Sequence, residues 1–217
     1  MKLFEHIIGF IILSLGIVLV IAAELGAGSM DAFNFYVNAL LSEHVSWLTL
    51  GRVAILNGVF VIILGFILSR DKKIFISFLW IFITGMFIDF WTLIVGYIPD
   101  AFYATLIMKF VFAASGVAII GFGVALTLDS GYPPSPFEYL LVILDKKINN
   151  IAITKIFIDV TYLILAIVLG YLYNDIFEQI GLFTIVLTFF TGVLVKHFSN
   201  QIDKYKSKKG VIKHVIE

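Results

Sequence analysis

Six long apolar stretches constrain this chain more than any other feature of its 217 residues. Each is about 20 residues long, the length at which an α-helix crosses the hydrocarbon core of a bilayer. A composition of 61% hydrophobic and 14% charged residues excludes an ordinary water-soluble domain. The run Gly58–Leu64 is apolar at every position, whereas a membrane β-strand alternates, so we predict helices. The predicted spans are His6–Leu25, Trp47–Leu68, Ile74–Ile98, Ala104–Leu128, Ala152–Tyr173 and Gln179–His197.

Charge outside the spans predicts the topology. Eleven of the fifteen basic residues lie outside the spans, and six crossings place all eleven on one side: Lys2, Arg70, Lys72, Lys73, Lys146, Lys147, Lys204, Lys206, Lys208, Lys209 and Lys213. The opposite loops carry only acidic charges, at Asp31, Glu43, Asp100, Asp175 and Glu178. The positive-inside rule therefore predicts that both termini are cytoplasmic. The formal net charge of zero gives no reason to expect a nucleic-acid partner.

The chain aligns with itself at an offset of 107 residues, without a gap. The offset superposes Gly16 on Gly123, Leu19 on Leu126, Asp31 on Glu138, and Thr84-Gly85 on Thr191-Gly192. Chance similarity between apolar segments is the alternative. Because each copy holds three spans, the second would enter the membrane from the opposite side. We predict an all-α polytopic membrane protein of two inverted three-helix repeats, residues 1–103 and 104–200, with a basic tail at 201–217.

A polar segment follows the first span of each repeat, at residues 24–41 and 129–144. Glycine or proline interrupts the preceding helix, and Ser29 or Ser135 is predicted to cap a short amphipathic helix with an acidic residue in its first turn. A helix lying flat in the headgroup region is the default expectation. The alternative is a broken-helix hairpin that dips inward, with free amides that could meet a ligand.

Several charged residues fall well inside the spans: Arg52, Asp89, Lys109, Lys155, Asp159 and Lys196. Charges at such depth usually face protein or water and are usually paired. We expect an Arg52–Asp89 bridge with Lys109 nearby in one leaflet. In the other leaflet we expect a Lys155–Asp159 pair with Lys196 nearby. These groups either join helices structurally or line a path for a solute or ion.

Other features predict packing rather than chemistry. Glycines recur every seven residues, at Gly9 and Gly16 and again at Gly51, Gly58 and Gly65, which favours close helix contact. No metal-binding, nucleophile-elbow or phosphate-loop motif is present, so we predict no enzyme, metal or cofactor. The lysines of the tail are expected to attract anionic lipid.

Residues 16–33, followed by Gly51, Gly58 and Gly65 and then by Gly85 to Asp89, resemble the YczE/YitT family of bacterial integral membrane proteins. The resemblance extends over most of residues 8–197, although Ser29 stands where that family often has proline. It implies a location in the bacterial cytoplasmic membrane and brings no settled activity with it.

Two functions follow as hypotheses. The first is a small-solute transporter or substrate-binding membrane component, with a path lined by Asp31, Arg52, Asp89, Lys109, Glu138, Lys155 and Asp159. The second is a non-transporting accessory protein that stabilises or regulates a partner complex. A protein partner or a homo-oligomer is compatible with either.

Overall fold

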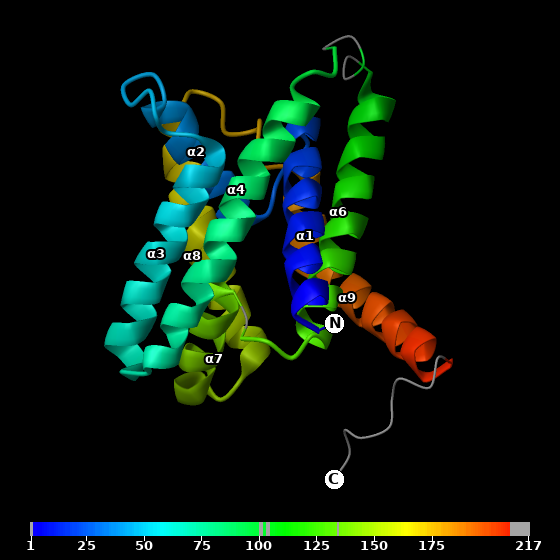
Figure 1. Cartoon of the computed structure of the whole chain (residues 1–217). Coiled ribbons are helices and arrows are strands. Elements are labelled where there is room, and N and C mark those ends of the chain that lie inside the picture. Colours follow the sequence, from blue (N-terminus) through cyan, green and yellow to red (C-terminus); the bar gives the residue numbers. More distant parts are fainter. Residues whose placement is uncertain (1, 100–101, 103–104, 134, 209–217) are drawn as a thin grey trace.

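A computed structural model describes residues 2–99, 102, 105–133 and 135–208, and the ordered elements are helical (Figure 1). Their bounds are α1 Lys2–Ala23, α2 Ser29–Leu41, α3 Leu50–Ser69, the 3-10 helix η1 Lys72–Ile76, α4 Ser77–Val95, α6 Leu106–Asp129, α7 Pro136–Ile148, α8 Ile151–Leu172 and α9 Leu182–Lys208. The expected boundary at residue 103 lies outside the described residues.

The prediction of six membrane spans is confirmed. Six helices of the described chain are long and apolar enough to cross a bilayer: α1, α3, η1 with α4, α6, α8 and α9. The last span begins later than predicted, at Leu182, because Gln179 is buried in a loop where its amide donates to the Ile21 carbonyl at 3.0 Å. It also continues past His197, to Lys208.

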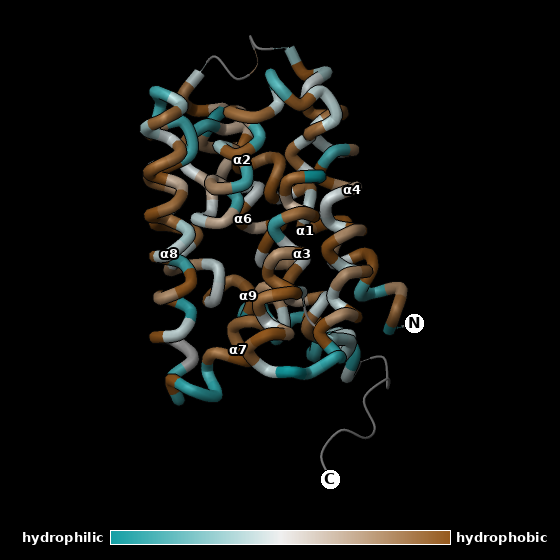
Figure 2. Tube along the Cα trace, turned by 90° about the vertical axis from the view of Figure 1, so that its left-hand side faces the viewer, coloured by the Kyte–Doolittle hydropathy of each residue, from teal (hydrophilic) through white to brown (hydrophobic). Residues whose placement is uncertain are grey.

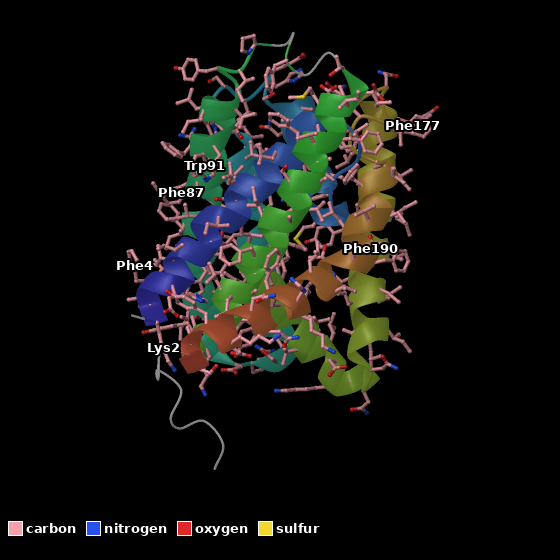
Figure 3. The ribbon with its side chains drawn as sticks, turned by 90° about the vertical axis from the view of Figure 1, so that its right-hand side faces the viewer. Lys2, Phe4, Phe87, Trp91, Phe177 and Phe190 are labelled. Carbon is pink, nitrogen blue, oxygen red and sulfur yellow. The ribbon has the colours of Figure 1, made fainter. Side chains whose placement is uncertain are left out.

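The bundle has a basic end and an acidic end. The basic end holds the start of α1 and the α3–η1 and α7–α8 links, and the acidic end holds the α2–α3 and α8–α9 links (Figures 1 and 2). Lys2, Arg70 and Lys146 lie at the basic end, whereas Glu43 and Asp175 lie at the acidic end. Asp100, Lys209 and Lys213 lie outside the described residues. Large apolar side chains such as Phe4, Phe177 and Phe190 project from the bundle, as expected of a lipid-facing surface (Figure 3).

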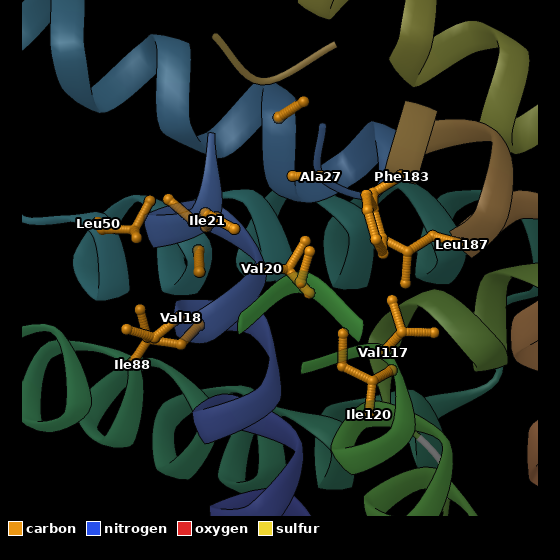
Figure 4. Packing of buried hydrophobic residues seen from close by; sticks show 14 of the residues in the cluster. Val18, Val20, Ile21, Ala27, Leu50, Ile88, Val117, Ile120, Phe183 and Leu187 are labelled. Atoms are coloured by element: carbon orange, nitrogen blue, oxygen red, sulfur yellow. The ribbon is translucent and has the colours of Figure 1, made fainter. Parts of the chain in front are cut away.

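The helices form two groups, which the packing of α3 on α4 joins. We call α1, α4, α6 and α9 the core group, because α1 packs on α4 and α6, and α6 packs on α9. We call α2, α3, α7 and α8 the flanking group, in which α2 and α7 each pack on both α3 and α8. Much of the buried apolar side-chain cluster comes from the core group, including Val20, Ile120 and Leu187 (Figure 4).

Glycines bring helix backbones together, as predicted. Gly9 and Gly16 of α1 face Gly123 and Gly116 of α6, where an added Cβ would collide with the opposing backbone. Gly51 of α3 meets the α4 backbone in the same way, whereas Gly58 packs on the Ile81 side chain of α4 and Gly65 on the Ile74 side chain of η1. Helices can approach this closely only where the residue lacks a side chain.

The short helices α2 and α7 do not lie flat at the surface. Each starts inside the bundle and runs outward, α2 toward the acidic end and α7 toward the basic end (Figure 1). The structure therefore favours the hairpin alternative. Ser135 caps α7 as predicted, but the Ser29 cap is wrong: Gly28 occupies the N-cap position of α2 and makes no side-chain bond.

The loop after α1 is joined to the segment before α9. The Ala27 amide donates to the Gln179 carbonyl at 2.9 Å, and the Phe183 amide donates to the Leu25 carbonyl at 3.0 Å. Gly26, at a φ of 109°, makes the turn that aims this loop inward. Backbone groups buried at this depth need such partners because lipid offers none.

Candidate functional site

A cavity of about 270 Å³, the central cavity, lies between the two groups of helices. Its walls include the middle of α1 at Leu13 and Ile17, the middle of α4 at Thr84, and Val124 of α6. The first residues of both α2 and α7 also line it. The two hairpins therefore bring their helix N-termini to one space at mid-depth of the bundle.

Asp31 enters the central cavity from the first turn of α2. A carboxylate is favoured there because the amides at a helix N-terminus carry partial positive charge. The Asp31 carboxylate nevertheless has no hydrogen-bond or salt-bridge partner among the described residues. It is thus a carboxyl group with open space in front of it.

Glu138 enters from the first turn of α7 and is satisfied locally. Its carboxylate accepts from the Ser135 amide at 3.0 Å and the Ser135 hydroxyl at 3.2 Å, while the Ser135 hydroxyl oxygen accepts from the Glu138 amide at 3.4 Å. This reciprocal capping box explains why the serine prediction succeeds for α7. Asp31 and Glu138 occupy the same position in their hairpins, but only the Glu138 carboxylate has hydrogen-bond partners among the described residues.

The predicted pair of Lys155 and Asp159 is confirmed on α8, where Nζ lies 2.8 Å from Oδ2. Both residues line the central cavity. The Lys155 side chain is 55% exposed and that of Asp159 is 18% exposed, so the pair extends from the cavity to its rim. Lys196 was expected nearby, but it is exposed on α9 and does not line the cavity.

The predicted bridge between Arg52 and Asp89 is wrong. Asp89 of α4 accepts from the Thr49 hydroxyl at 2.6 Å and the Gly51 amide at 2.8 Å, and so caps the N-terminus of α3 from a neighbouring helix. Arg52 is exposed and donates to the Trp47 carbonyl. The free amides at the start of α3, rather than the arginine, supply the positive partner of the Asp89 carboxylate.

Lys109 lies at the acidic end and pairs with Glu24, at 2.5 Å, rather than with Asp89. These two residues line a wide recess of about 520 Å³ that also includes Asn38. Of the seven predicted path residues, the structure therefore brings four into the central cavity: Asp31, Glu138, Lys155 and Asp159. Two line recesses at the acidic end, and Arg52 lines neither the central cavity nor these recesses.

Comparison with known proteins gives the family. Residues 1–200 match the model of a family of unknown function, DUF6198. The chain belongs to this family. The DUF6198 chain is 29% identical over 214 residues to the uncharacterized protein YyaS of Bacillus subtilis strain 168, which covers 97% of this chain and 100% of the relative. It is 27% identical over 190 residues to the uncharacterized membrane protein YczE of the same organism, covering 87% and 80% of the two chains.

These matches confirm the resemblance to YczE and identify the DUF6198 chain as a multi-pass membrane protein related to one from Bacillus. No solved structure matches it. The family description names no activity, so any function has to be argued from the site.

A buried polar network in this DUF6198 protein escaped the sequence analysis. Asn57 of α3 donates to the Asn34 side-chain oxygen at 2.9 Å and accepts from the Tyr162 hydroxyl at 2.8 Å. The network joins α2, α3 and α8 within the flanking group. An asparagine inside an apolar span is the sequence signal for such a network, because polar side chains there form hydrogen bonds between helices.

A second network links α1, α6 and α9 at the basic end. Lys206 lies 2.7 Å from Glu5 and also pairs with Asp129. Beside it, His6 is fully buried, with Nδ1 2.6 Å from the Ser130 hydroxyl oxygen and its ring 4.3 Å from that of Trp80. Sequence spacing could not reveal these contacts, because they join residues from opposite ends of the chain. Within the described residues, no group of three His, Asp or Glu side chains could hold a metal ion.

Proposed function

We propose that this protein is a carrier that moves a small solute across the bacterial cytoplasmic membrane through the central cavity. The observation that carries the proposal is the convergence of two oppositely directed hairpin helices on one cavity, each contributing an acidic residue. Half-helices that end at mid-membrane are the usual way in which secondary transporters build a binding site.

The proposal includes two inverted repeats related by the offset of 107 residues. A Cβ on Gly16 would lie 2.8 Å from the Ile120 backbone nitrogen, and one on Gly123 would lie 2.7 Å from that of Leu13. Gly16 corresponds to Gly123, and Leu13 to Ile120. The same contact is therefore made twice, once from α1 to α6 and once from α6 to α1. Such a repeated contact supports a twofold axis between the two helices. A second pair of contacts repeats in the same way. A Cβ on Gly9 would lie 3.0 Å from the Thr127 backbone nitrogen, and a Cβ on the corresponding Gly116 would lie 3.0 Å from the Val20 backbone nitrogen.

The central cavity lies on this proposed axis, since its walls contain residues from both members of several corresponding pairs. These include Leu13 and Ile120, Ile17 and Val124, Gly28 and Ser135, Asp31 and Glu138, and Thr84 and Thr191. A cavity on the axis between two inverted repeats can be exposed to either side of the membrane in turn.

We place the basic end in the cytoplasm, with both termini, because the positive-inside rule favours that orientation. Lys204, near the end of α9, would then face the anionic lipid of the inner leaflet. The proposal assigns no catalytic step to the chain.

Asp31 is the residue on which a solute or coupling ion would depend most. An unpaired ionised carboxylate costs several kcal/mol at membrane depth, so it favours a proton or a cationic group as a partner. Glu138 and Asp159 differ, because their carboxylates already have protein partners.

The test begins with a thermal-shift screen of the purified protein against a library of small metabolites, followed by flux of any stabilising compound into proteoliposomes. We expect at least one compound to stabilise the wild type and to be transported, and the Asp31→Asn variant to lose both effects. Glu43→Gln is the matched control, since Glu43 is exposed in the α2–α3 link and does not line the cavity. If Asp31→Asn behaves as wild type while a stoichiometric protein partner copurifies from native membrane, the accessory function replaces the carrier.

A further inference from the structure

We propose that the described conformation is one of two that the protein adopts, with the central cavity open toward the basic end between α8 and α9 and closed between α3 and α4. This inference rests on the proposed function and specifies how its site is reached.

The closed side is sealed by backbone packing between α3 and α4. Gly51 and Gly85 lie back to back, so that a Cβ on either would collide with the carbonyl oxygen of the other, and Gly58 packs on Ile81. Asp89 then fastens the acidic half of this seam, through its bonds from the Thr49 hydroxyl and the Gly51 amide. Water cannot pass between two helices in backbone contact.

The open side lies between α8 and α9, which within the described chain do not form a packed seam like that between α3 and α4. Gly192 of α9, the counterpart of Gly85, has nothing within 4 Å of an added Cβ. Asp159 and Lys155 of α8 and Thr191 of α9 all line the cavity, and Lys155 is more than half exposed. An ion pair facing acyl chains would be costly, so this opening is filled by water rather than lipid.

The opening reaches the basic end of the bundle. Lys155 is four residues from the start of α8, which places it roughly 6 Å along the helix axis from that end. Asp159 lies one turn deeper, and Asp31 lies in the same cavity. From the basic end inward, the cavity is therefore lined first by Lys155 and then by Asp159, and it also holds the unpaired carboxylate of Asp31.

The two sides are counterparts under the proposed repeat, because α3 corresponds to α8 and α4 to α9. Contacts inside each group follow the symmetry: α1 packs on α4 as α6 packs on α9, and α2 packs on α8 as α7 packs on α3. The symmetry fails between the two groups, where α3 and α4 form a packed seam but α8 and α9 do not. Rocking the flanking group against the core group would exchange the seams and expose the cavity at the acidic end.

The chain has no cysteine, so single cysteines can report on water access without background. Thr84 and Thr191 are corresponding residues that line the same cavity, and each hydroxyl donates to the carbonyl four residues earlier, at 2.9 and 2.6 Å. They form a matched pair of reporters, one beside the closed seam and one beside the open seam. The probe is a positively charged, membrane-impermeant methanethiosulfonate, which reacts with thiolate in water.

In vesicles of both orientations, we expect Thr191→Cys to be modified at least about tenfold faster than Thr84→Cys, and only from the basic end, because Thr191 is partly exposed beside the open seam whereas Thr84 is buried against the closed one. Equal rates at the two positions, or modification of Thr191→Cys from the acidic end alone, would overturn the inference.

A second pair of variants tests the seam itself. Asp89→Ala, introduced beside Thr84→Cys, should increase its modification from the acidic end by weakening the α3–α4 seam. Asp89→Ala introduced beside Thr191→Cys should leave the Thr191→Cys thiol modified only from the basic end. A misfolded protein would be modified from both sides of the membrane. An unchanged rate at Thr84→Cys would contradict the role given to Asp89. Labelling needs no solute, so this experiment gives a result even if no transported compound is found. Failure of the carrier function can therefore be distinguished from failure of this inference.

Discussion

A Cβ on Gly16 would lie 2.8 Å from the carbonyl oxygen of Gly116, and one on Gly116 would lie 2.8 Å from the carbonyl oxygen of Gly16. The backbones of α1 and α6 are therefore in direct contact at the centre of the core group. No side chain could be inserted at either residue without separating the two helices.

We expect Gly16→Ala and Gly123→Ala to destabilise the protein by similar amounts, about 1–3 kcal/mol each, because both methyl groups would overlap opposing backbone. Thermal unfolding in detergent measures the loss. Gly192→Ala is the control, since its added Cβ meets nothing within 4 Å. A loss at Gly16 without one at Gly123 would argue against equivalent environments in the two copies.

Removing the Tyr162 hydroxyl should weaken the flanking group. Tyr162→Phe leaves the Asn57 side-chain oxygen without its donor, and we expect a loss of about 1 kcal/mol in the free energy of unfolding. Thr161→Val serves as the control, because Thr161 is exposed and bonds only within its own helix turn. Equal effects of the two substitutions would show that the network contributes nothing specific.

The contact between Asp71 and Tyr139 should make stability depend on pH. The Lys73 amide first, and then the Tyr139 hydroxyl at 2.7 Å, lower the pKa of Asp71 below its ordinary 3.8. A lowered acid pKa stabilises the fold at pH above 3.8, and this contribution is lost as the pH falls through the lowered value. Burial first, and then Asp71, raise the pKa of Tyr139 to about 12, so its contribution is present below 10.0 and is lost as the pH rises toward 12.

Melting temperatures of the wild type and Tyr139→Phe, compared across pH, test this link. We expect the difference between them to be largest near neutral pH and to shrink in strong acid and strong base. A constant difference across the range would mean that the hydroxyl contributes through packing alone.

Lys206 should be needed to hold α1, α6 and α9 together at the basic end. Lys206→Met leaves Glu5 and Asp129 close together without their shared cation, and we expect a loss of about 1–2 kcal/mol. Lys204→Met, at an exposed residue of the same helix, should be neutral. Adding Asp129→Asn to Lys206→Met should restore part of the loss, and failure to do so would contradict the proposed repulsion.

The sequence predicts the spans well because the bilayer fixes both their length and their composition. It also identifies Gly16 and Gly58 as packing residues and Lys155–Asp159 as a pair, since helix geometry alone sets those relationships.

Partners from different helices could not be predicted in the same way. Asp89 binds the start of α3 rather than Arg52, because its partner depends on how α3 and α4 meet and not on charge alone. The tilt of the two hairpins is likewise decided by tertiary packing, so the sequence left both of its alternatives open. Asn57 and Tyr162 lie 105 positions apart, and only the folded chain brings them together.

The hydrogen bonds of Ala27 and Phe183 have a consequence for biogenesis. The ribosome delivers the loop after α1 long before it delivers the segment that precedes α9, yet each supplies the other with a backbone partner. Until the last helix arrives, the nascent chain must keep the inward turn after α1 hydrated or shielded by the insertion machinery. Assembly of the hairpin is thus a late event in synthesis, although its residues are among the first to be made.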